Sequence, residues 1–192
     1  MMTKSLKRVM AMTLIMIFTI GGMTFADTTT TPTVLREENQ ARMTNVFENY
    51  NPEKVDAFIA LNAEHMAFHT GQAAKREALL EQAKTTFAAI RDQVTKGDLT
   101  REEGLATIAA IRSENEATRA EVQSVLELKR TELELLKSVN EDIRGTLKTL
   151  LTAEVKDTVA IQEILDEILM QLSKHIEIDQ KYAAMIDEIV YQ

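Results

Sequence analysis

Apolar residues recur along most of the chain at alternating intervals of four and three, the spacing of a helix face that packs against another helix. Between residues 52 and 95, this spacing selects Val55, Ile59, Asn62, Met66, His69, Ala73, Arg76, Leu80, Ala83, Phe87, Ile90 and Val94. Between residues 100 and 149, it selects Leu105, Ile108, Arg112, Asn115, Arg119, Val122, Leu126, Lys129, Leu133, Leu136 and Asn140. No proline follows Pro52, so the pattern predicts long, uninterrupted helices.

Local signals place the helix starts. Asn51-Pro52-Glu53 is typical of an N-cap followed by proline at the first helical position. Thr100-Arg101-Glu102-Glu103 has the sequence of a capping box, and Thr152-Ala153-Glu154 is a weaker start. The predicted helices cover residues 36–49, 52–95, 100–149 and 153–190.

A tight turn at Gly97-Asp98 would bring the two longest helices together as an antiparallel hairpin. In that register Phe87 faces Ile108, and Ile90 faces Leu105. The last helix offers a third apolar face, formed by Ile161, Leu165, Ile168, Leu172, Tyr182, Ile186 and Ile189. We therefore predict an all-α fold, a long antiparallel helical hairpin plus a third long helix, in an elongated three-helix bundle or coiled coil. Self-association through these faces, giving a homo-oligomer rather than a monomer, is the alternative.

The N-terminus has the features of a signal peptide. Basic residues precede an apolar run from Val9 to Ile20, and Thr24-Phe25-Ala26 provides small residues three and one positions before a cut. The predicted organisation is a signal peptide over residues 1–26, a disordered Thr-rich linker over 27–35 and one helical domain over 36–192. This predicts an extracytoplasmic protein, periplasmic or secreted, cleaved near Ala26. An uncleaved anchor is the alternative.

Charge and cysteine content exclude several classes of function. Residues 1–26 carry three basic and no acidic residues, so their removal changes the net charge from −8 to −11. Such an acidic surface argues against binding to nucleic acid or, unaided, to anionic lipid. The chain contains no cysteine, which excludes disulfides and a lipoprotein anchor. After residue 26, no stretch approaches the ~18 apolar residues of a membrane span, so stable insertion is not expected, and a membrane-active helical protein is a minor alternative.

Two histidines are the clearest candidates for site chemistry. His65 and His69 are four residues apart and so share a helix face, as a metal-binding pair requires. The segment lacks the HExxH pattern and fixes no third ligand, since His175 is distant in sequence. The sequence therefore predicts no metal or other cofactor, with an extracytoplasmic metal sensor as an alternative. It also contains no nucleophile motif and no phosphate-binding loop, and an enzyme is not expected.

The predicted turn region is rich in large apolar residues. They are Phe87, Ile90, Val94, Leu105, Ile108 and Ile111. Two helices cannot bury all of them, and Ile111 is expected on the outer side. One interpretation is a surface that binds a protein partner or client. The other is that these residues seal the hairpin against each other.

The chain resembles the Spy/CpxP group of small periplasmic chaperones and stress adaptors. Leu99-Thr100-Arg101-Glu102-Glu103 and Leu151-Thr152-Ala153-Glu154 are both Leu-Thr helix starts, although neither has the glutamine that completes that group's Leu-Thr-x-x-Gln motif. The resemblance implies an exported, non-enzymatic helical protein, and no functional residue is transferred. The predicted function is thus an interaction module of this kind, such as an envelope chaperone or stress adaptor.

Overall fold

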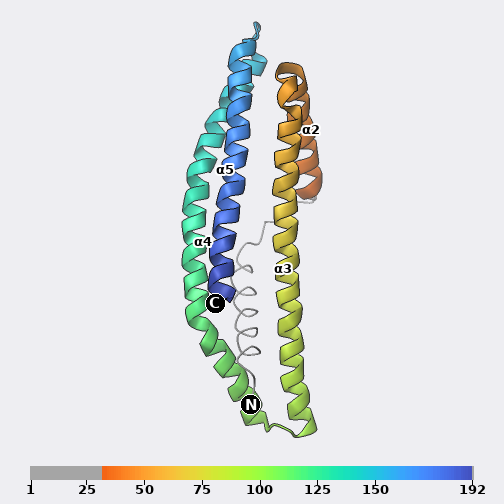
Figure 1. Cartoon of the computed structure of the whole chain (residues 1–192), viewed down its shortest axis with the longest axis vertical. Helices are drawn as coiled ribbons and strands as arrows, with labels where there is room; N and C mark the ends of the chain where they lie inside the picture. Colours follow the sequence, from red (N-terminus) through yellow and green to blue (C-terminus); the bar gives the residue numbers. More distant parts are fainter. Residues whose placement is uncertain (1–31, 192) are drawn as a thin grey trace. The chain divides into compact units, whose positions relative to one another are not determined.

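The computed structural model describes residues 32–191, and these form helices without a strand. The elements are α2 (Pro32–Tyr50), the 3-10 helix η1 (Pro52–Lys54), α3 (Val55–Lys96), α4 (Arg101–Thr152) and α5 (Thr158–Tyr191) (Figure 1). The all-α prediction is confirmed. Helix α2 begins four residues before its predicted start, and the predicted signal peptide lies outside the described residues.

The described residues divide into two compact units, and each unit combines segments distant in sequence. The first unit contains residues 69–128 and 182–191. The second unit contains residues 32–68 and 129–181. Helices α3, α4 and α5 each contribute to both units.

One predicted helix start is confirmed, and another is only partly right. The capping box is confirmed, because Glu103 Oε2 accepts a hydrogen bond from the Thr100 backbone N–H at 2.8 Å and the Glu103 N–H donates to Thr100 Oγ1 at 3.2 Å. These hydrogen bonds to Thr100 lower the pKa of Glu103. Asn51 precedes η1, but its side chain does not cap the helix; its Nδ2 donates to Asp166 Oδ1 at 3.2 Å instead.

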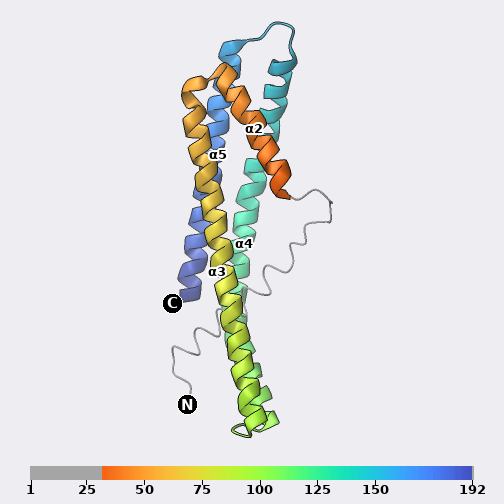
Figure 2. The ribbon, with the colours of Figure 1, turned by 90° about the vertical axis from the view of Figure 1, so that its right-hand side faces the viewer.

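The predicted start of the last helix at Thr152 is wrong. Helix α4 continues to Thr152, and Asp157 caps α5 by accepting a hydrogen bond on Oδ1 from the Ala160 backbone N–H at 3.0 Å. An aspartate side chain satisfies an unpaired N–H group of the first turn better than the Thr-Ala-Glu sequence does at 152–154. The connection at 153–157 is exposed along its whole length, and Figure 2 draws it as a thin loop.

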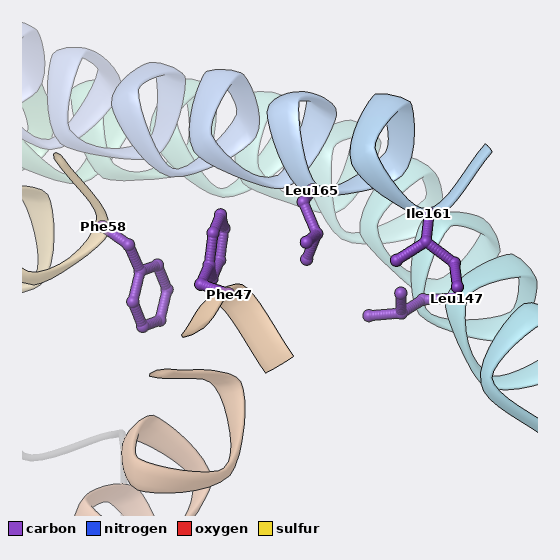
Figure 3. Close-up of a cluster of buried hydrophobic side chains, with 5 residues drawn as sticks. All are labelled: Phe47, Phe58, Leu147, Ile161 and Leu165. Carbon is purple, nitrogen blue, oxygen red and sulfur yellow. The ribbon is translucent and has the colours of Figure 1, made fainter. Parts of the chain in front are cut away.

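The main core of the second unit joins α2, α3, α4 and α5. Its buried members are Phe47, Phe58, Leu147, Ile161 and Leu165 (Figure 3). The rings of Phe47 and Phe58 stack with their centroids 4.7 Å apart. Helix α2 is therefore part of the core and not a peripheral extension.

In the first unit, α3 and α4 pack in a register that differs from the predicted one. Ile90 is buried against Ile111 and Ile108, whereas Leu105 is 59% exposed. The reason is Gly104, since a Cβ atom at that position would lie 2.6 Å from Val94 Cγ2. The helices approach closely at the glycine, and this turns Leu105 away from α3.

A similar one-residue difference affects α3 elsewhere. Phe58 and Leu79 are buried, whereas the predicted seam residue Ile59 is 43% exposed. The predicted helix faces therefore have the right spacing, but their phase was wrong by one position at Ile59 and at Leu105.

Near the end of α5, Val190 packs with Val122 of α4 within the first unit.

Candidate metal centre

Four polar side chains from three helices meet inside the second unit. His65 comes from α3, Lys129 from α4, and His175 and Asp179 from α5. His175 and Asp179 are four residues apart, so one turn of helix places both on the same face. We call these four residues the Asp179 cluster.

Asp179 is the centre of the cluster and is almost completely buried, with 1% of its side chain exposed. Its Oδ1 lies 2.7 Å from Lys129 Nζ. Its Oδ2 lies 3.4 Å from His65 Nε2 and 3.8 Å from His175 Nε2. The two histidine rings are tilted by 60° with their centroids 5.0 Å apart. Three side chains therefore converge on one buried carboxylate.

The surroundings of Asp179 keep it ionised. Burial alone would raise the pKa of its carboxyl group, but hydrogen bonds from His65 and Lys129 and the charges of Lys129 and His175 outweigh burial and hold the pKa well below its ordinary value. A buried carboxylate is costly without such partners. The negative charge of Asp179 is thus a stable feature of the second unit near neutral pH.

Two further contacts hold the same helices around the cluster. Gln180 of α5 donates to Glu64 of α3 at 3.0 Å. Lys181 of α5 forms an ion pair with Glu132 of α4 at 2.8 Å. Each of these residues is next to a member of the cluster or within one turn of it. They restrict the rotation of the helices that present the cluster.

The lowered pKa of Asp179 predicts a specific loss of stability in acid. A carboxyl group whose folded pKa lies below its unfolded value, near 3.8, stabilises the fold above that value, and the contribution is lost as pH falls through the folded pKa. Urea unfolding of the metal-free protein between about pH 5 and pH 3 should show a steeper fall in unfolding free energy for the wild type than for Asp179→Asn. Equal slopes for the two proteins would show that Asp179 does not carry this dependence.

The cluster also has the donor groups of a metal centre. One ligand atom from each of His65, His175 and Asp179 lies within 4.8 Å of the others, and no other such group of three was found in the part of the chain that the structure describes. Two imidazole nitrogens and a carboxylate oxygen form a donor set that suits Zn²⁺ and neighbouring divalent transition metals. His175 is 36% exposed, so an ion could enter from solvent on its side.

The sequence named His65 and His69 as weak metal candidates, and the structure groups His65 with other residues instead. The partner of His65 in this group is His175, 110 positions later, and not His69. Sequence spacing identifies only residues on the same helix. His175-Asp179, with the i, i+4 spacing on the last helix, was the signal that could have completed the site.

The six apolar residues near the turn have mixed environments. Ile90 and Ile111 are buried against each other, which shows that the expected exposure of Ile111 is wrong. Phe87, Val94 and Ile108 are partly buried, and Leu105 is exposed. Ile90, Ile108 and Ile111 thus stabilise the junction of α3 and α4, as the second interpretation of this region expected.

Comparison with known proteins identifies no relative of the chain. No protein-family model matches it, and neither a curated protein nor a solved structure shows significant similarity. None of the helices in residues 32–191 is both long and apolar enough to cross a membrane.

Proposed function

We propose that the protein is an extracytoplasmic, non-enzymatic helical bundle that binds a divalent transition-metal ion, with Zn²⁺ as the reference ion. The observation that carries the proposal is the convergence of His65, His175 and Asp179, with three potential ligand atoms within 4.8 Å of one another. With three protein ligands, the fourth coordination position of a tetrahedral Zn²⁺ stays open for water or for a group from another molecule. This arrangement suits a protein that senses or carries a metal.

The predicted signal peptide and the predicted helix arrangement add to the proposal. The predicted signal peptide would place the protein outside the cytoplasm, where it meets metal ions from the surroundings. An antiparallel hairpin of α3 and α4 with α5 as the third helix is the arrangement in which ligands on different helices can face one shared interior.

The test is a Zn²⁺ titration of the full chain, followed by calorimetry and thermal unfolding. We expect one saturable site per chain, with stabilisation of about 2.7 kcal/mol when free Zn²⁺ reaches 100 times the dissociation constant. His65→Ala and His175→Ala should each abolish that stabilisation. His69→Ala is the matched control, because it removes an imidazole one turn away that is not part of the group, and it should bind as the wild type does.

Two results would contradict metal binding at this site. One is the absence of any saturable stabilisation by Zn²⁺, Ni²⁺ or Co²⁺. The other is stabilisation that survives in His175→Ala, since binding would then use other residues. In either case, the Asp179 cluster would be an ion-pair network that orders the three helices.

A second candidate function is binding of a protein partner or client along α4. It is favoured by Leu135 and Val139, large apolar residues one turn apart that are 69% and 41% exposed. Leu135→Ser and Val139→Ser together should then reduce retention of a reduced, unfolded model protein, such as α-lactalbumin, on the immobilised chain. Unchanged retention would exclude this surface.

A further inference from the structure

The two oxygens of the Asp179 carboxylate have different neighbours. Oδ2 lies near the two histidines, at 3.4 and 3.8 Å, and is the oxygen that belongs to the candidate metal centre. Oδ1 lies 2.7 Å from the Lys129 ammonium. A metal ion held by Oδ2 would therefore share one carboxylate with a cation that is already part of the protein.

We infer that Lys129 is an internal competitor of the metal and sets the concentration at which the site fills. The inference rests on the proposed function. Metal and ammonium would be only a few ångströms apart, and Lys129 is 25% exposed, so solvent would screen their repulsion only in part. The ammonium pairs with Asp179 Oδ1 in the metal-free protein, and any weakening of that pair by the metal would count against metal binding.

Competition at Asp179 has a structural consequence, because the Lys129 ammonium and the metal ion would connect different pairs of helices. The Lys129–Asp179 pair connects α4 to α5, whereas a metal on His65 and Asp179 connects α3 to α5. Coupling between two sites is reciprocal, so if Lys129 weakens metal binding, the metal weakens the Lys129–Asp179 pair by the same factor. Filling the site would strengthen the attachment of α3 to α5 and loosen that of α4. A metal sensor needs such a change in order to report occupancy.

The experiment compares Zn²⁺ dissociation constants of the full chain, measured by competition with a chelating indicator. Lys129→Gln removes the charge but keeps a hydrogen-bond donor, and it should bind Zn²⁺ roughly 5–150-fold more tightly than the wild type. Lys129→Arg keeps the charge and should stay close to the wild type. Lys181→Gln is the matched control: it removes a lysine charge from an ion pair of α5 with α4 that does not involve Asp179.

The possible outcomes separate the two proposals. If the wild type binds Zn²⁺ and Lys129→Gln binds no more tightly than Lys181→Gln, the inference is overturned and the metal centre stands. If only Lys129→Gln binds, competition by Lys129 is supported, and metal binding by the natural protein is not. If no variant binds, both proposals fail.

A measurement on the wild type covers the case in which Lys129→Gln does not fold. The Lys129 ammonium can be followed by NMR of ¹⁵N-labelled lysine side chains, assigned with Lys129→Arg. Adding Zn²⁺ should shift this signal and speed its hydrogen exchange as the pair with Asp179 weakens. A Lys129 signal that does not change at saturating Zn²⁺ would overturn the inference.

Discussion

Replacing Leu165 with Ala is expected to lower the unfolding free energy of the protein by about 2–5 kcal/mol. Leu165 is 0% exposed and packs in the second unit with Phe47, Phe58, Leu147 and Ile161. Truncation removes buried methyl groups and leaves a cavity that helices fixed by these neighbours can fill only in part. Chemical unfolding followed by circular dichroism measures the change.

The matched control is the same substitution at an exposed leucine of the same unit. Leu135 is 69% exposed, and Leu135→Ala should change the unfolding free energy by no more than about 0.5 kcal/mol. If the two substitutions had equal effects, Leu165 would not be in the principal core. A costly Leu135→Ala would instead indicate that this residue is covered in solution by another chain.

Lys129→Met should destabilise the metal-free protein by about 3–5 kcal/mol, because Asp179 would be left buried without its closest cation. The double substitution Lys129→Met with Asp179→Leu removes both charges and should recover most of that loss, since apolar replacements of a buried pair are often neutral. The unfolding free energies of Lys129→Met, Asp179→Leu and the double variant are measured by urea unfolding at neutral pH in the presence of a chelator.

The control for this cycle is the exposed Lys75–Asp187 pair of the first unit, at 2.7 Å. Because water screens it, Lys75→Met should cost no more than about 1 kcal/mol. If Lys129→Met cost equally little, the two histidines would be sufficient partners for Asp179. If the double variant remained as unstable as Lys129→Met, the loss would come from packing of the lysine chain and not from an unpaired charge.

The extent to which the fold could be predicted depended on whether the signals were local. The absence of proline after Pro52 and the capping box at Thr100 gave the long helices and one of their starts correctly. The phase of the helix faces was harder to predict, because Ile59 is about as apolar as its buried neighbour Phe58, and Leu105 is far more apolar than its buried neighbour Gly104. The close approach at Gly104 decided the outcome for Leu105. A pattern of apolar positions does not reveal that a glycine without a side chain lets two helices approach closely.

The candidate metal centre was only partly predictable for a related reason. His65 was identified from its spacing to His69, but its ligand partners are on α5. Lys129 was one of the polar residues in the predicted seam, and it proves to be the counter-ion of a carboxylate from α5. Contacts between residues on different helices, 50 or more positions apart here, depend on which helices are neighbours, and helical periodicity alone does not determine that.

The exposed connection at 153–157 is a suitable site for attaching a chemical label. Val155 is 86% exposed, whereas the Asp157 side chain, which caps α5, must be kept. The chain contains no cysteine and no tryptophan, so Val155→Cys would provide the sole thiol for attaching a fluorophore or a solid support. Loops of this kind tolerate such additions well. Metal binding could then be followed optically on protein oriented by a single, chosen attachment point.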